Sequence, residues 1–233
     1  MNGKRLVALE KVSKVYTIAG GKEFWALRDV SLEVYDRELL AIMGPSGHGK
    51  TTLMNMMGLL DKPTSGRVIV DDVDTARLDD AELSRLRNEK LGFVFQQYNL
   101  INRMSVLENI EIPLVLRGIP RDQRFGMAQK ALELAAGDKS WLNKRPSQLS
   151  GGEQQRVAIT RAIVGDPQII LADEPTGNLD SASAKSIIHT FLGLNAAGKT
   201  IIMVTHNPEV ASASRRILYI KDGRITGEET QGR

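Results

Sequence analysis

A short stretch in the first quarter of the sequence carries residue types suited to binding phosphate. It fits the pattern G-x-x-x-x-G-K-[ST] and reads Gly44-Pro45-Ser46-Gly47-His48-Gly49-Lys50-Thr51-Thr52. An apolar run of strand length precedes it, and good helix formers follow it. The glycines let backbone N–H groups surround an anion, and a helix start adds its positive dipole end. We predict that residues 44–52 bind a nucleoside triphosphate, with Lys50 on its β- and γ-phosphates and Thr51 on Mg²⁺.

Two adjacent acids follow an apolar run much later in the chain. Asp173 and Glu174 come directly after residues 169–172, which have the composition of a strand buried in a parallel sheet. Such a pair on its own is usually two solvated loop acids. With a phosphate loop in the same chain, the first acid can complete a Mg²⁺ shell, and the second can deprotonate a water aimed at the γ-phosphate.

A histidine also ends a predicted strand. His206 follows residues 200–205, and a lone histidine there is more often a hydrogen-bonded strand cap. Near the phosphates it could instead hold a γ-phosphate oxygen and the attacking water, since a histidine is a donor even when neutral. We assign no role to the side chains of His48 and His189.

A second glycine-containing segment opens a predicted helix. It reads Leu149-Ser150-Gly151-Gly152-Glu153-Gln154-Gln155-Arg156. A helix start with exposed N–H groups is suited to an anion. Taken alone, the segment is equally explained as a helix cap and nothing more.

Composition places the chain among ordinary globular proteins. It has 233 residues, 42% apolar and 25% charged, which suffice for a sizeable core. It has no cysteine, which excludes disulfides and thiolate metal sites, and the net charge is +3. No apolar run approaches the ~20 residues of a membrane span, and the first residues lack a signal-peptide pattern. We therefore expect a cytoplasmic protein.

The pattern of apolar residues predicts an α/β fold. Strands are expected at 6–10, 26–34, 67–70, 91–95, 169–173, 200–205, 216–220 and 224–226, the last two joined as a hairpin across Asp222-Gly223. Helices are expected at 79–87, 123–136 and 181–197, and 97–147 has a helical character with a capping box at Ser105–Glu108. Tyr16 is expected between the first two strands, Pro113 to punctuate the chain, and residues 227–233 to form a frayed tail.

Taken in order, these motifs resemble the ATP-binding-cassette (ABC) family over essentially the whole chain. The matching set is the phosphate loop at 44–51, Gln96, the signature at 149–153, Asp173-Glu174, Asp180 and His206. The resemblance implies an α/β fold with a P-loop NTPase core at 1–96 and 158–226. It also implies an antiparallel β portion near the N-terminus and a helical subdomain inserted at 97–157.

The resemblance also assigns roles on the nucleotide. Tyr16 looks like the aromatic that stacks on adenine, Glu174 like the general base and His206 like the γ-phosphate switch. Gln96 resembles the glutamine that contacts Mg²⁺ or the water, together with Thr51 and Asp173 as the implied metal ligands. Two further roles belong to a dimer: the signature residues Ser150, Gly151, Gly152 and Glu153 would bind the γ-phosphate held by a partner subunit, and Asp180 would communicate across the dimer.

Residues 93–100 and 171–180 are similar to those of ATPases of lipoprotein-release and macrolide-export systems. Glu153, His48 and Thr160 depart from common family residues, but the catalytic positions do not. The implied protein hydrolyses ATP with Mg²⁺, forms a homodimer with ATP, and powers separate membrane subunits from the inner membrane face. The alternative is a mechanical or signalling ATPase that transports nothing, like that of the bacterial cell-division complex.

Other classes are disfavoured. Members that act on ribosomes usually carry two cassettes, and those that act on DNA carry long coiled-coil insertions, so no nucleic-acid partner is expected. A P-loop kinase would not need the signature.

Overall fold

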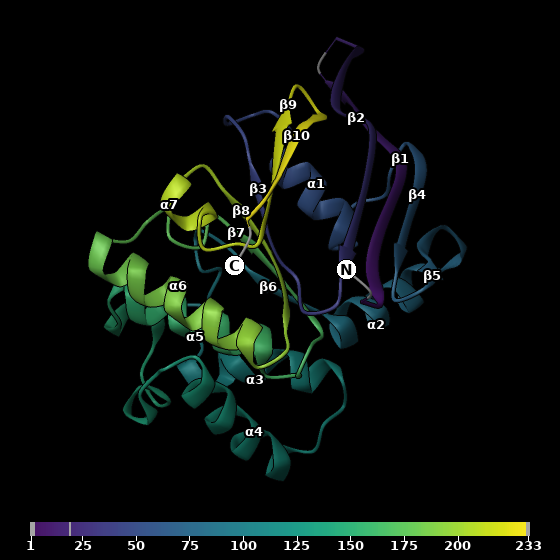
Figure 1. The fold of residues 1–233 in the computed structure, drawn as a ribbon. Helices are drawn as coiled ribbons and strands as arrows, with labels where there is room; N and C mark the ends of the chain where they lie inside the picture. Colours follow the sequence, from purple (N-terminus) through teal and green to yellow (C-terminus); the bar gives the residue numbers. More distant parts are fainter. Residues whose placement is uncertain (1–2, 19, 232–233) are drawn as a thin grey trace. The chain divides into compact units, whose positions relative to one another are not determined.

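The computed structural model describes residues 3–18 and 20–231, and its chain divides into two compact units. One consists of Met1–Arg85 with Ile202–Arg233, and the other of Leu86–Ile201. The elements are α helices and β strands in mixed order, which confirms the predicted α/β class (Figure 1). The subdomain boundaries expected at 97 and 157 stay a prediction.

The first unit contains an antiparallel sheet in which β2, β1, β4 and β5 are neighbours in that order (Figure 1). The bounds are β1 Arg5–Ile18, β2 Lys22–Tyr35, β4 Ser65–Val70 and β5 Val73–Asp74. Apolar residues alternate with exposed ones along much of β2, so one face of the sheet is buried as the sequence predicts. The antiparallel β portion expected near the N-terminus is therefore present.

Tyr16 lies inside β1, opposite Phe24 of β2, and not between the strands as expected. Polar and charged residues interrupt the apolar pattern of β1, and Lys11 has a φ of 50° where the register shifts. Such a bulge interrupts the alternation of apolar and polar residues, so the full length of the strand cannot be predicted from that alternation.

The same unit holds β3 (Leu39–Met43), β9 (Arg216–Lys221) and β10 (Arg224–Thr230), with β3 and β9 parallel. β9 and β10 form the predicted hairpin, and Asp222 and Gly223 have φ of 52° and 73° at its turn. The unit's helices are α1 (Lys50–Met57), α7 (Pro208–Ala211) and the start of α2 (Asp80–Lys90).

Residues 227–230 belong to β10, so the frayed tail predicted from residue 227 is wrong for these four. Residues 232–233 lie outside the described residues. The strand continues because its polar side chains find partners on β9: the guanidinium of Arg216 binds the Glu228 carboxylate, and the Tyr219 hydroxyl donates to Glu229 at 2.9 Å.

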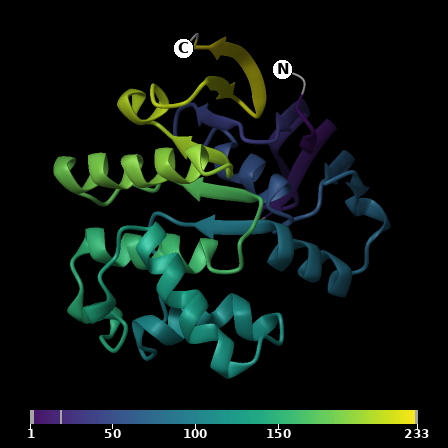
Figure 2. The ribbon, with the colours of Figure 1, turned by 60° about the horizontal axis from the view of Figure 1, so that its bottom comes forward.

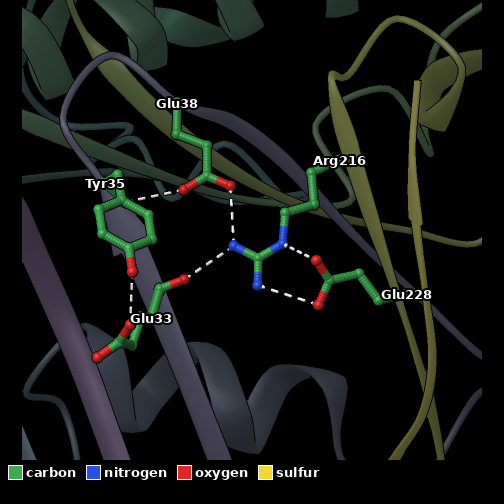
Figure 3. Close-up of polar contacts among 5 residues, drawn as sticks. All are labelled: Glu33, Tyr35, Glu38, Arg216 and Glu228. Atoms are coloured by element: carbon green, nitrogen blue, oxygen red, sulfur yellow. Dashed lines mark hydrogen bonds and ion pairs between the residues drawn. The ribbon is translucent and has the colours of Figure 1, made fainter. Parts of the chain in front are cut away.

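Arg216 also joins the hairpin to the turn that precedes β3 (Figure 3). Its guanidinium donates to the Glu38 carboxylate at 3.0 Å and to the Glu33 carbonyl at 2.9 Å. Two further bonds, of 2.7 and 3.2 Å, reach Glu228. The side chains of Arg216 and Glu38 are only 12% and 3% exposed, so this is a buried ion pair whose guanidinium is well supplied with acceptors.

The second unit combines the parallel strands β6 (Leu91–Val94) and β7 (Ile169–Asp173) with helices. Its helices are α3 (Val106–Leu116), α4 (Arg121–Leu134), α5 (Gly151–Ile163) and α6 (Ser181–Ala196). Helices α3, α4 and α5 pack against one another (Figure 2). Strand β8 (Thr200–Thr205) contains the boundary between the units.

Pro113 lies inside α3 and does not end it. The capping box of Ser105 and Glu108 starts this helix as predicted. The fully buried Ile110 and Leu114 on either side of the proline anchor the helix in the core. Tertiary packing therefore outweighs the hydrogen bond that proline cannot donate.

Candidate functional site

The phosphate loop of the first unit joins β3 to α1 and passes close to other backbone. A Cβ on Gly44 would overlap with the carbonyl oxygen of Ile220 on β9. Gly49 has a φ of +103°, and a Cβ there would lie 2.5 Å from the Ala26 carbonyl oxygen. Gly49 is also the N-cap of α1 and supplies no side-chain cap. The sequence therefore folds into the loop and helix start that a phosphate requires.

Lys50 directs its ammonium group back over this loop. The Nζ atom donates to the carbonyls of Gly44 at 2.8 Å and of Pro45 at 3.0 Å, and the residue is 7% exposed. Thr51, the predicted metal ligand, is exposed at the first turn of α1, and Thr52 is half-buried beside it. The Lys50 ammonium group and the Thr51 hydroxyl group therefore both lie at the start of α1.

His48 ties the loop to the turn of the β9–β10 hairpin. Its Nδ1 atom lies 2.9 Å from a carboxylate oxygen of Asp222 and 3.1 Å from that residue's backbone nitrogen. The N–H of Gly223 donates to the His48 carbonyl at 3.1 Å. The side chain of His48, for which no role was predicted, thus connects the loop to the hairpin turn.

Tyr16 lies in the same unit as the loop. Its hydroxyl donates to Asp61 at 2.8 Å, and the Lys14 ammonium lies 4.9 Å from the ring centre and 2.7 Å from Asp61. Burial raises the pKa of Tyr16 and the Asp61 carboxylate raises it further, while a hydrogen bond with the Thr52 side chain opposes the shift. The ring is therefore held in one orientation by its neighbours.

The second unit carries the acids. Asp173 ends β7 and Glu174 follows it, while Gln96 comes shortly after the neighbouring parallel strand β6. Because β6 and β7 are parallel and Val94 is paired with Ala172, the two strands end at the same edge of the pair. Gln96, Asp173 and Glu174 all lie at this edge. Glu174 has a φ of 46°, a left-handed conformation that is uncommon for residues other than glycine.

The turn after Glu174 contacts Gln96 directly. The Gln96 amide donates to the Asn178 side chain at 3.3 Å, and the Asn178 amide donates to the Gln96 carbonyl at 3.0 Å. A Cβ on Gly177 would lie 2.7 Å from the Gln96 amide nitrogen. A shift in the position of Gln96 would therefore displace the turn that carries Glu174.

The signature forms the start of α5 in this same unit. Ser150 is the N-cap, and a capping box with Glu153 is present, with the Ser150 N–H donating to the carboxylate at 2.7 Å. A Cβ on Gly151 would lie 2.9 Å from the hydroxyl of Tyr98, and one on Gly152 would lie 3.2 Å from that of Ser183. A side chain at either position would therefore have to displace the Tyr98 or Ser183 hydroxyl that lies against the start of α5.

Asp180 caps α6, and the start of this helix lies beside the signature through Ser183. Its carboxylate accepts from the N–H groups of Ala182 and Ser183, both at 3.0 Å. Hydrogen bonds from the Ser183 side chain and backbone lower the pKa of Asp180, so it is ionised at neutral pH. His206 is exposed just after β8, in the first unit.

Each unit thus gathers part of the predicted set. The first holds Tyr16, residues 44–52 and His206, and the second holds Gln96, the signature, Asp173, Glu174 and Asp180. Sequence reasoning missed the contacts of Tyr98, Asn178 and Ser183 with these residues, and the buried amide of Gln155. Their one signal was proximity in the chain to a motif.

The comparisons with known proteins agree with this set of motifs. Residues 27–177 match the family model described as "ABC transporter". An "Uncharacterized ABC transporter ATP-binding protein" of Thermotoga maritima is 47% identical, covering 98% of this chain and 97% of that protein. The "Macrolide export ATP-binding/permease protein MacB 1/2" of Paracoccus denitrificans is 45% identical over 99% of this chain, which spans 34% of it.

A solved structure has the same fold. The ATP-binding cassette MJ0796, from Methanocaldococcus jannaschii and in a dimeric post-hydrolysis state bound to ADP and Pi, has a TM-score of 0.90 and 44% identity. The match covers 98% of this chain and 100% of that one. The predicted ABC fold, the ATPase activity and the resemblance to export ATPases are confirmed. The chain belongs to the ABC transporter family, as one of its ATP-binding and ATP-hydrolysing cassettes.

Proposed function

We propose that this cassette powers export or extraction by separate membrane subunits, through a homodimer that closes on ATP. The observation that carries the proposal is the strained Glu174 beside Asp173 at the edge where Gln96 also lies. The Paracoccus relative, which its name describes as both ATP-binding and permease, supports a membrane partner. Among the described residues no helix has the length and apolar character to span a bilayer. The proposed location is the inner face of the membrane, held by those subunits.

The residues of the first unit are proposed to hold the nucleotide. Lys50 would exchange its bonds with loop carbonyls for bonds with the β- and γ-phosphates, aided by the backbone N–H groups of residues 46–52. Tyr16 would stack on adenine. Ser150, Gly151 and Gly152 would bind the γ-phosphate held by the partner subunit, since a capped helix start still presents N–H groups to an anion.

Thr51, Gln96 and Asp173 are the proposed Mg²⁺ ligands. They offer a hydroxyl, an amide and a carboxylate oxygen, the hard donors that Mg²⁺ prefers. Gln96 and Asp173 leave neighbouring strand ends, which fits a shared ion. When bound, Mg²⁺ would neutralise charge on the β- and γ-phosphates.

Glu174 is the proposed general base, which takes a proton from the attacking water. His206 would hold a γ-phosphate oxygen. Gln96 would change position with the γ-phosphate and, through its hydrogen bonds with Asn178, shift the turn that contains that residue. Asp180, at the start of α6 beside the signature, would relay that state across the dimer.

The test is Glu174→Gln, whose amide cannot accept the proton. We expect ATP binding to persist and hydrolysis to fall by about 10²–10⁴-fold, the usual contribution of a general base. Lys50→Ala should instead weaken ATP binding itself. Binding is measured with a fluorescent ATP analogue and hydrolysis by phosphate release. Near-normal turnover of the Glu174 variant would exclude it as the base.

Coupling to the membrane is proposed to run through the loop after Gln96. The fully buried Asn109 side chain holds this loop, accepting from the Ile101 N–H at 2.7 Å and donating to the Ser105 carbonyl at 2.9 Å. Ile101 itself is 44% exposed. Leu100, Met104 and Leu107 are half-buried and extend the apolar surface, on which a short helix of a membrane subunit could dock.

A cysteine crosslinking experiment tests this, because the chain has no cysteine of its own. Ile101→Cys should crosslink to an integral membrane protein in membranes of the source organism. Leu116→Cys, 73% exposed at the end of α3, is the matched control and should not. Equal capture at both positions, or none at Ile101, would contradict the docking site and leave the apolar residues a packing role.

A further inference from the structure

The direction of the Glu174 side chain depends on a short turn. Its φ of 46° is unfavourable for a residue with a Cβ, so surrounding contacts must impose it. Within the turn, the Gly177 N–H donates to the Glu174 carbonyl at 3.0 Å. What holds this turn therefore holds the proposed base.

Gln155 of α5 holds it from the inside of the unit. This side chain is fully buried, and its Nε2 atom donates to the carbonyl of Pro175 at 2.7 Å. Pro175 directly follows Glu174 and has no N–H, so its carbonyl is its only backbone hydrogen-bonding group. The amide therefore fixes the peptide unit between Pro175 and Thr176, one residue after the base.

The other end of the same amide argues against a purely stabilising role. The Oε1 atom of Gln155 is buried and has no hydrogen-bond partner among the residues that the structure describes. Burying an unsatisfied carbonyl is unfavourable, and a methionine of similar size would avoid it. The property that methionine lacks is the donor that reaches Pro175.

Gln155 is also connected to the signature by a single helix. It lies five residues after Ser150, about 7.5 Å along the axis of α5 at the usual helical rise. Resting on the function proposed above for Glu174, we propose that Gln155 is a positioning residue for this base. Helix α5 thereby ties the signature to the alignment of Glu174, so that contact with the partner's ATP and activation of water move together.

The first measurement is single-turnover hydrolysis by Gln155→Met. We expect the rate to fall by roughly 10–100-fold, the effect of a small misplacement of a catalytic group. ATP affinity should be unchanged, because the phosphate loop belongs to the other unit. Gln129→Met on α4, the same substitution at a partly buried glutamine, is the control and should keep the rate. A normal rate in Gln155→Met would overturn the proposal.

A double-mutant cycle separates positioning from stability. In the Glu174→Gln background, Gln155→Met should cause no further loss, since there is no base left to position. Multiplying losses would overturn the inference. Gln155→Asn, whose shorter side chain does not bring its amide to Pro175, should give the same result. It replaces Gln155→Met if thermal unfolding shows that the methionine variant does not fold. If Glu174→Gln alone keeps hydrolysing, the proposed base fails, which is a separate result.

Discussion

Glu153 places a negative charge at the start of the helix proposed to receive the partner's γ-phosphate. The hydrogen bonds from the backbone and side chain of Ser150 lower its pKa, so the carboxylate is ionised at neutral pH. It closes the capping box and yet would repel ATP. The same side chain thus orders the signature and weakens its contact with phosphate.

Glu153→Gln keeps a residue that can close the box and removes the charge. In the Glu174→Gln background we expect ATP-dependent dimers to tighten by about two- to fivefold, a usual size for an exposed charge interaction. Sedimentation over a range of protein concentrations measures this. Glu108→Gln, the same capping position on α3, should leave the dimer unchanged. A weaker Glu153→Gln dimer would contradict the repulsion.

At this scale the motifs could be found from sequence because their chemistry depends on near neighbours. The phosphate loop and its flanking strand and helix are one continuous segment. The partners of Gly151 and Gly152 could not be found, because Tyr98 and Ser183 lie far away in the chain and meet the signature only through packing.

Among the elements, the β9–β10 hairpin depends on Arg216. Arg216→Met should lower the free energy of unfolding by about 3–5 kcal/mol, because it leaves the Glu38 carboxylate buried without its partner. Urea denaturation of the whole chain measures the loss.

The matched control for that loss is Arg67→Met. Its pair with Glu10 lies at 2.6 Å, but the side chains are 60% and 37% exposed, so the loss should stay below about 1 kcal/mol. Equal losses in the two variants would show that burial does not strengthen the dependence on Arg216.

Strands and helices with clear periodicity were predictable, and β7 and β8 agree with expectation at both ends. The errors share a cause. Residues 227–230 and the part of β1 beyond the predicted 6–10 are polar stretches that form strands because they have cross-strand partners. Pro113 is tolerated inside α3 because the helix packs into the core. Local sequence does not contain those interactions.

For the whole molecule, the ATP-closed homodimer is the central expectation, and the dimeric MJ0796 structure supports it. Glu174→Gln should bind ATP without consuming it, so it should elute as a dimer with ATP and as a monomer with ADP. Lys50→Ala, which should not hold the nucleotide, is the control and should stay monomeric. A monomer under saturating ATP would count against the ATP-closed homodimer.

The first unit is built from the two ends of the chain, and this has a consequence for protein synthesis. The phosphate loop rests on Ile220 of β9 and is braced by Asp222, about 170 residues later in translation. A ribosome-bound chain that has made the loop therefore lacks the strand against which it forms. Nucleotide binding should appear only when the last strands emerge, so a nascent cassette cannot hydrolyse ATP before it is nearly finished.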